Sequence, residues 1–367
     1  MMIIFCIGTT LKIFLLPTLL LKSVGRDGLI VISVLLIFEL LLLIACLIAI
    51  KLSPNLTFTQ ALERHFGKIA ARVIAAILVL YACLKLLLLF TETRSFFESS
   101  LFDQFVWPVM GLPLFGLAAL VAAKSLSGVS RLFEIFAPLV FASLIILGIM
   151  IAPNVDFGNA LPLFTAGGGT IARQSLSFAV WTGDFVLLLL FVGKTRPQGK
   201  LITLGIISAV IGTLLVIFFA VVLTATFANL PHLIEYGHNM RNLAIFGAGN
   251  LAYGRIDIIL FAVWAIGLII QSLLYGYFAV SLLSYIFGVS TGKYRLLLSG
   301  ILMTILYVVT IVMFSSSSTA YQFARSWPRF LAIGVQCLVI IGAIVMSIIF
   351  GRRGKNGKKN TAAKNQT

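Results

Sequence analysis

The chain has 367 residues, of which 60% are apolar and only 10% charged, and its mean hydropathy is +1.12. A water-soluble surface does not tolerate this composition, so the sequence predicts a protein embedded in lipid, without a separate soluble domain. The formal net charge of +16 does not indicate a nucleic-acid partner, because the basic residues lie between apolar runs and at the C-terminus, not on one amphipathic face.

Apolar runs long enough to cross about 30 Å of hydrocarbon recur along the whole chain. They predict an all-α integral membrane protein with about ten transmembrane helices. We expect residues 1–350 to form a single transmembrane domain and the basic segment 351–367 to be a disordered cytoplasmic tail. In chain order, the expected helices cover residues 1–21, 28–50, 69–91, 104–123, 134–153, 174–193, 201–228, 256–287, 296–315 and 328–350.

The loops predict the orientation of the chain. About twice as many lysine and arginine residues lie in one set of loops and the tail as in the alternate set. Because basic loops stay on the cytoplasmic side, we expect both termini to be cytoplasmic. Two loops on the opposite side are long, 154–173 and 229–255. The second carries His232 and His238 without a cysteine or carboxylate at matching spacing, so neither a metal nor a cofactor is expected.

Four ionisable side chains fall inside the predicted spans: Lys12, Glu39, Lys85 and Asp184. Charge buried in lipid is costly, so each needs a partner or water. Lys85 lies close enough to the end of its span to snorkel to the surface. Glu39 lies midway along its span, so it should pair with Lys12 or Lys85. If Lys12, Glu39 or Lys85 titrated during a conformational change, it would couple that change to protons.

Two spans make poor continuous helices. Residues 8–10 place a glycine beside two β-branched threonines ahead of Pro17, and residues 182–184 interrupt the apolar run of the sixth span. Broken helices survive at membrane depth where their freed backbone groups line a cavity, and these groups can bind an anion or an ammonium. The alternative is close packing of glycine and threonine between helices. Breaks in spans one and six are the pattern of a five-plus-five inverted repeat, with halves of about 1–153 and 154–350.

Short motifs at these breaks resemble a known superfamily, the amino acid–polyamine–organocation transporters. Ile7-Gly8-Thr9-Thr10 with Pro17 resembles their first-helix motif, and Ser177–Asp184 resembles their sixth-helix motif, an aromatic-Ala pair followed by Gly and an acidic residue. More narrowly, nearly the whole chain resembles the permease-like B subunit of bacterial spore germinant receptors. That resemblance rests on Gly25-Arg26-Asp27, Asn159-Ala160-Leu161-Pro162, and Arg255-Ile256-Asp257 leading to Trp264.

The resemblance implies a nutrient, such as an amino acid, bound between helices 1 and 6. By that resemblance, its carboxylate would meet Gly8, Thr9 and Thr10. Its amino and side-chain end would be lined by Phe178, Trp181, Thr182, Gly183 and Asp184. The resemblance also implies the inner membrane of a spore and A-type and C-type receptor subunits as partners. Lys12 departs from the transporter pattern, and it would either meet the substrate carboxylate or be locked to Glu39.

Three functions remain open from the sequence. The first is a receptor subunit that binds a nutrient and triggers germination, and the second is a proton-coupled amino acid transporter with the same site. The third is a structural subunit with a vestigial pocket. The resemblance alone favours the first. An enzyme is not expected, because the chain has no H-E-x-x-H helix, Walker loop or nucleophile elbow.

Overall fold

The computed structural model describes residues 2–53, 56–100, 107–124, 126–194, 199–227, 242–243, 256–289, 292–313 and 317–364. Within these ranges every regular element is a helix, which confirms the expected all-α fold. The first half contains α1 (Met2–Phe14), α2 (Leu16–Val24), η1 (Gly25–Asp27), α3 (Gly28–Leu52), α4 (Phe58–Ser100), α5 (Trp107–Ala123), α6 (Leu126–Ile151) and η2 (Ala152–Asn154). The second contains η3 (Phe157–Ala160), α7 (Gly168–Phe178), η4 (Ala179–Trp181), η5 (Asp184–Phe191), α8 (Gly199–Phe227), α10 (Ile256–Phe287), α11 (Gly292–Met313), α12 (Ser317–Ala324) and α13 (Pro328–Lys364).

In the described part of the chain, seven helices are long and apolar enough to span a membrane, and one bent pair, Gly168–Trp181 with Asp184–Phe191, raises the number to eight. Large apolar side chains such as Ile69, Ile149 and Val312 are exposed on the outside of the bundle, as a lipid-facing surface requires. The chain is therefore an integral membrane protein. Each of the ten expected spans coincides with a helical segment, while the count of ten and the inverted repeat remain predictions.

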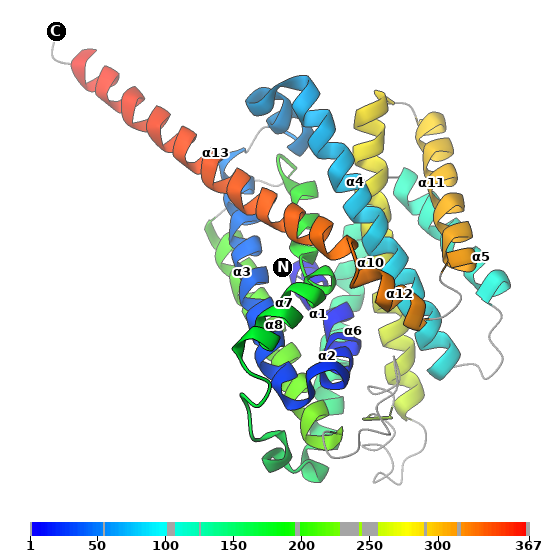
Figure 1. The fold of residues 1–367 in the computed structure, drawn as a ribbon. Coiled ribbons are helices and arrows are strands. Elements are labelled where there is room, and N and C mark those ends of the chain that lie inside the picture. The colour runs from blue at the N-terminus through cyan, green and yellow to red at the C-terminus, as the bar shows by residue number, and fades with distance from the viewer. Residues whose placement is uncertain are drawn as a thin grey trace.

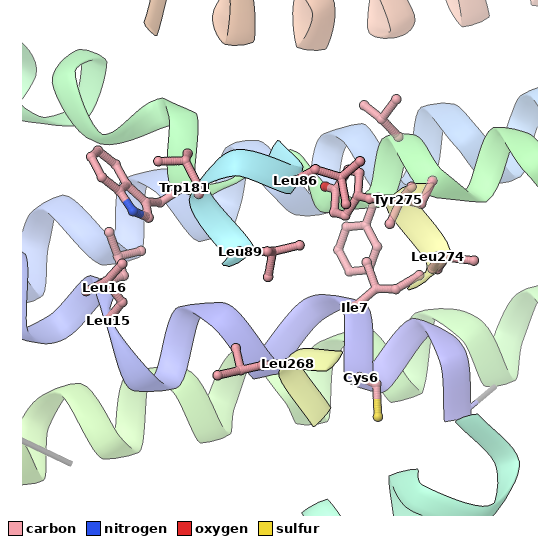
Figure 2. Packing of buried hydrophobic residues seen from close by; sticks show 14 of the residues in the cluster. Cys6, Ile7, Leu15, Leu16, Leu86, Leu89, Trp181, Leu268, Leu274 and Tyr275 are labelled. Atoms are coloured by element: carbon pink, nitrogen blue, oxygen red, sulfur yellow. The ribbon is translucent and has the colours of Figure 1, made fainter. Parts of the chain in front are cut away.

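The helices form one bundle around α1, which lies near its centre (Figure 1). Helix α1 contacts α6, α8, α10 and η5, while the long helices α4 and α10 pack side by side and α5 packs on α11. Figure 2 shows that the apolar side chains around α1 come from several helices, among them Leu86 and Leu89 of α4 and Leu268 and Leu274 of α10. An interior filled in this way leaves few places where a polar side chain can lie.

The first span is broken, but not at the residues that the sequence indicated. Helix α1 runs continuously through residues 8–10, and the interruption lies at Leu15, between α1 and α2. The physical reason is Pro17, which has no N–H to donate to the carbonyl of Ile13 and whose ring clashes with it. Glycine and threonine at positions 8–10 cost helix propensity but remove no hydrogen bond, so tertiary packing keeps them helical.

Helix α13 extends to Lys364, away from the bundle (Figure 1), and thus through most of the segment 351–367 that composition predicted to be disordered. No proline follows the apolar part of α13 to stop it, and a nucleated helix adds one hydrogen bond for each further residue.

The corner between α2 and α3 is tied to the first long loop. Gly25 adopts φ +63° there, and the buried carboxylate of Asp27 accepts hydrogen bonds from three groups of the loop. The Phe164 N–H lies 2.5 Å from Asp27 Oδ1 and the Thr165 hydroxyl 2.9 Å from Oδ2, which also accepts the Ala166 N–H. These bonds fix the loop 164–166 over the α2–α3 corner. The second long loop, with His232 and His238, lies outside the described residues apart from 242–243.

Candidate functional site

The sixth span is broken where the sequence predicted. After the short turn η4, Thr182 is extended and Gly183 adopts φ +89°, a left-handed conformation that glycine tolerates best, before η5 begins at Asp184. The two halves of the span are bent by 42°. At the break the carbonyls of Ala179 and Gly183 accept the N–H groups of Thr182 (3.3 Å) and Val186 (3.2 Å), three residues ahead, in place of α-helical hydrogen bonds.

Two polar side chains from other helices also donate hydrogen bonds to carbonyls at the break. Gln336 of α13 donates its amide N–H groups to the carbonyls of Ala179 (3.0 Å) and Thr182 (3.3 Å). The Tyr81 hydroxyl of α4 donates to the carbonyl of Gly183 at 3.0 Å. A Cβ atom at Gly183 would lie 2.5 Å from Gln336 Nε2 and 2.7 Å from the Tyr81 oxygen. The hydrogen bonds of Gln336 and Tyr81 thus require a glycine at position 183, because any other side chain would collide with both donors.

Beside the break lies a cluster of four buried charges. The Lys12 ammonium lies 2.9 Å from Glu39 Oε1 and 2.9 Å from Asp184 Oδ2, and Lys85 Nζ lies 2.8 Å from Asp184 Oδ1. All four side chains are at most 2% exposed. Since they come from α1, α3, α4 and η5, the cluster joins both halves of the chain. The predicted pairing of Glu39 with a lysine is present, and Lys12 is that lysine.

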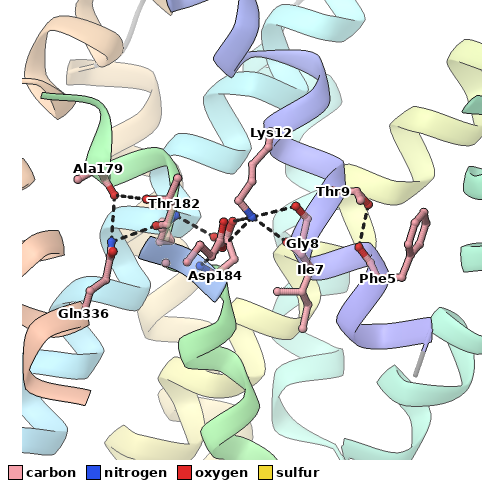
Figure 3. A network of polar contacts seen from close by, with 12 residues as sticks. Phe5, Ile7, Gly8, Thr9, Lys12, Ala179, Thr182, Asp184 and Gln336 are labelled. Atoms are coloured by element: carbon pink, nitrogen blue, oxygen red, sulfur yellow. Dashed lines mark hydrogen bonds and ion pairs between the residues drawn. The ribbon is translucent and has the colours of Figure 1, made fainter. Parts of the chain in front are cut away.

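Hydrogen bonds complete the surroundings of the cluster. Lys12 also donates to the carbonyls of Ile7 (3.2 Å) and Gly8 (3.1 Å), one helical turn earlier in α1 (Figure 3). The Tyr275 hydroxyl of α10 donates to Asp184 Oδ1 at 2.5 Å, and the Asp184 N–H donates to Glu39 Oε1 at 3.1 Å. Two ammonium groups therefore face two carboxylates, with no net charge, in a buried environment where an unpaired charge would be strongly destabilising.

Snorkelling of Lys85, one of the two interpretations left by the sequence, is wrong. The side chain is fully buried, and its ammonium points to Asp184 instead of the surface. The carboxylate on η5 offers an ion pair inside the bundle, which removes the need to reach water.

The other sequence-predicted site residues lie in different places relative to the break. Thr182, Gly183 and Asp184 lie at the break. Gly8 packs against it, since a Cβ atom there would lie 3.2 Å from the ring of Phe185. Thr9 faces away, because its hydroxyl donates to the Phe5 carbonyl at 2.8 Å and its methyl group packs against α8. The side chain of Thr10 lies outside the described residues.

Phe178 and Trp181 form an aromatic wall on the η4 side of the break. Both are buried, with ring centroids 5.3 Å apart, and Trp181 also contacts the ring of Tyr321 at 6.3 Å. The guanidinium of Arg325 lies 4.7 Å from the Phe178 ring. The indole N–H of Trp181 has no hydrogen-bond partner among the described residues, although such a group normally finds one when it is buried.

Three residues at the site were missed from the sequence: Tyr81, Tyr275 and Gln336. The sequence indicated charged side chains within the spans and the residues of the two predicted breaks, and these three residues belong to neither set. Gln336 is an amide inside an apolar run, and this signal could have found it. The two tyrosines carry no such signal, because tyrosine is also a common apolar filler in membrane helices.

A discontinuous membrane helix beside buried ion pairs is characteristic of permease-like membrane proteins, where irregular backbone lines the solute site. This is the class that the fold and the site define. A family model described as spore germination protein matches residues 1–323, and the chain belongs to that family. The family is transporter-like or receptor-like and not an enzyme family. No curated protein matches the chain.

Proposed function

We propose that this protein is the membrane subunit of a spore nutrient receptor, and that it binds a small zwitterionic nutrient, an amino acid, at the break of the sixth span. The observation that carries the proposal is the neutral cluster of two ammonium and two carboxylate groups next to unwound backbone. Permease-like proteins bind solutes at such breaks.

The charge pattern selects the ligand class. A zwitterion that enters between Lys12 and Asp184 can place its carboxylate on the lysine and its ammonium on Asp184 and Glu39. Every buried charge then keeps a partner of opposite sign, so the exchange avoids the cost of an unpaired ion. An uncharged sugar could not replace the ion pair it separates. A simple carboxylate or amine would leave one charge unpaired.

The aromatic wall is suited to the other end of the ligand. Phe178 and Trp181 offer apolar surface, and the indole N–H of Trp181, which has no partner in the described part of the chain, offers one donor to a polar atom of the nutrient. Gly8, Thr182 and Gly183 would contribute backbone groups around the charged end. We assign Thr9 no direct role, since its methyl group packs against α8. Thr10, whose side chain lies outside the described residues, stays a predicted contact of the ligand carboxylate.

Signalling follows if the two states of the site differ in their ion pairs. Because α1, α3, α4 and η5 each contribute one charge, a ligand that exchanges these pairs shifts the relative stability of helix arrangements. We propose that A-type and C-type receptor subunits receive this change, and that the protein lies in the spore inner membrane with both termini in the cytoplasm. The excess of basic residues in one set of loops supports that orientation.

A binding screen on the purified protein tests the ligand class. We expect amino acids to raise the midpoint of thermal unfolding, with about 2.7 kcal/mol of stabilisation at a hundred times Kd. For a stabilising amino acid, its amide, its des-amino acid and its decarboxylated amine should each lose most of the effect. Stabilisation by sugars or nucleosides with none by amino acids would refute the proposal, and no stabilisation by any nutrient would favour a structural subunit.

Proton-coupled transport is the second candidate, and the buried carboxylate of Glu39 supports it. Uptake of a labelled amino acid by vesicles containing this chain alone separates the two functions, because a sensor binds without flux. If flux occurs, Glu39→Gln should abolish its pH dependence, since the amide cannot carry a proton between states. Uptake that keeps its full pH dependence in this variant would remove Glu39 from coupling.

A further inference from the structure

A basic pocket lies away from the four-charge cluster, where the sixth span ends. Its volume is about 190 Å³, and the polar residues that line it are Thr57, Thr59, Lys194, Tyr277, Ser281 and Arg295. Among the described residues that line it, none is acidic. Glu63, one turn after Thr59 on α4, accepts a hydrogen bond from the Tyr285 hydroxyl at 3.0 Å and is not a lining residue.

Two cations are held around one ring in this pocket. The buried ring of Tyr277 lies 5.5 Å from the Lys194 ammonium and 5.0 Å from the Arg295 guanidinium. Arg295 Nη2 donates to Ser281 Oγ at 3.0 Å and to the Ala122 carbonyl at 3.3 Å, while its buried Nε has no partner among the described residues. The pocket therefore presents two cationic side chains, together with the hydroxyl groups of Thr57, Thr59 and Ser281, a combination that suits a phosphoryl group.

An apolar groove adjoins this pocket. It has a volume of about 480 Å³ and is lined by apolar residues of α4 and α13, with Ala49 of α3 and Leu189 of η5. Phe58 and Leu189 line both cavities, so the groove and the basic pocket share a wall. Residues of the α13 segment 334–345 form one wall of the groove, on a bundle whose long apolar helices can span a membrane.

We propose that the pocket and the groove together form a site for one anionic phospholipid, with the phosphate at Lys194 and Arg295 and an acyl chain in the groove. The depth is appropriate, because Lys194 follows the last residues of the sixth span and Arg295 lies in the first turn of α11. Acyl chains are the same in anionic and zwitterionic lipids, so the headgroup pocket makes the selection.

The lipid would act on the half-helix that carries Asp184. Helix η5 begins at Asp184 and ends near the pocket, where Gly193 lies so close to Leu56 that a Cβ atom would be 2.2 Å from its carbonyl oxygen. A headgroup bound between Lys194 and Arg295 links this end of η5 to α11. Occupancy of the lipid site thus favours the arrangement of η5 seen in this structure.

Photo-crosslinking of the full chain in phosphatidylcholine nanodiscs tests this inference. The probe is a phosphatidylglycerol with a diazirine in one acyl chain, and mass spectrometry locates the crosslinks. We expect crosslinks within residues 334–345. Unlabelled phosphatidylglycerol should compete at least tenfold better than phosphatidylcholine with the same chains, and inorganic phosphate should not compete.

Variants separate the headgroup from the tail. Lys194→Gln with Arg295→Gln should lower crosslinking in the groove at least tenfold, while Lys51→Gln with Arg64→Gln, which removes the same charges from exposed positions, should not. Gly342→Leu should block the groove, because a Cβ atom there meets nothing within 4 Å and the side chain has space to fill.

Three results would overturn the inference. Equal competition by phosphatidylcholine would mean that the groove takes any acyl chain, and competition by inorganic phosphate would mean a pocket for a soluble anion. Undiminished crosslinking in a folded Lys194→Gln, Arg295→Gln protein would remove both cations from the site. The two competition results need only the wild-type protein, so they test the lipid site even if a variant fails to fold.

Discussion

Removal of the Lys12 ammonium tests the buried cluster most directly, because this group is paired with both carboxylates. In the Lys12→Met variant, Glu39 and Asp184 face a single ammonium, that of Lys85, and the interior carries one unpaired negative charge. Breaking one partner out of a buried ion pair typically costs about 3–5 kcal/mol, because the remaining charge has neither water nor a counter-ion. We expect a loss of stability in this range. Lys51→Met, at an exposed position on α3, should stay within about 0.5 kcal/mol of the wild type.

The double variant Lys12→Met, Glu39→Gln distinguishes pairing from packing. It leaves the Lys85–Asp184 pair neutral, and the substituted amide can still accept the Asp184 N–H. Its destabilisation should therefore be smaller than the sum of the two single variants by about 2 kcal/mol or more. The assay is equilibrium unfolding of the purified proteins in mixed micelles, with Glu39→Gln alone as the fourth corner of the cycle.

A double variant whose destabilisation equals the sum of the two single losses would refute this reasoning, since the two charges would then be energetically independent. If Lys12→Met is too unstable to purify, the yield of membrane-inserted protein supplies the comparison. Adding Glu39→Gln should then restore the yield of inserted protein. A yield that stays low would mean, as additive losses would, that the two charges are energetically independent.

Two further substitutions test the break and the loop anchor, each against a matched control. Gly183→Ala should cost about 1–3 kcal/mol more than Gly67→Ala, because both positions have positive φ but only Gly183 would displace two hydrogen-bonding side chains, and unfolding curves measure the difference. Asp27→Asn should lower the free energy of unfolding by about 1–3 kcal/mol and raise amide hydrogen exchange in 164–166. The side-chain NH₂ group of the asparagine would face an N–H or O–H donor of the loop in place of an acceptor. Asp156→Asn should change little, since among the described residues one carboxylate oxygen accepts a single bond, from the Gly158 N–H, and an amide oxygen can accept it as well.

Much of the fold could be predicted because lipid imposes strong rules on sequence. Apolar length located the helical segments, and the expected span 256–287 coincides with α10. The break at Gly183 was visible because a glycine beside an acidic residue interrupts an apolar run, although close packing between helices was the alternative. Likewise, Glu39 midway along its span required a partner, and only a lysine within another span could provide one.

The misplaced features depend on geometry that sequence does not carry. The break of the first span was predicted at residues 8–10 but lies at Leu15. The hydrogen bond lost at Pro17 destabilises the helix more than the weak helix propensity of Gly8 does. The partner of Lys85 depends on how α4 is rotated about its axis, and this rotation is set by packing against α10. Tyr81 likewise acquires its role only when α4 lies against the break.

The same cluster that stabilises the bundle also limits how it can move. Lys12 on α1 is bonded to carboxylates on α3 and η5, so any shift of α1 relative to these helices must break an ion pair or exchange it. Breaking costs several kcal/mol in a buried site. In the function we propose, exchange with a ligand that carries both charges avoids this cost. Unless water enters, the bundle should hold one arrangement when no nutrient is present and gain access to another when a zwitterion supplies the substitute partners. A ligand-gated sensor needs this difference between the ligand-free and the ligand-bound bundle. A cluster of uncharged hydrogen bonds would provide it only weakly, because such bonds break at much lower cost than buried ion pairs.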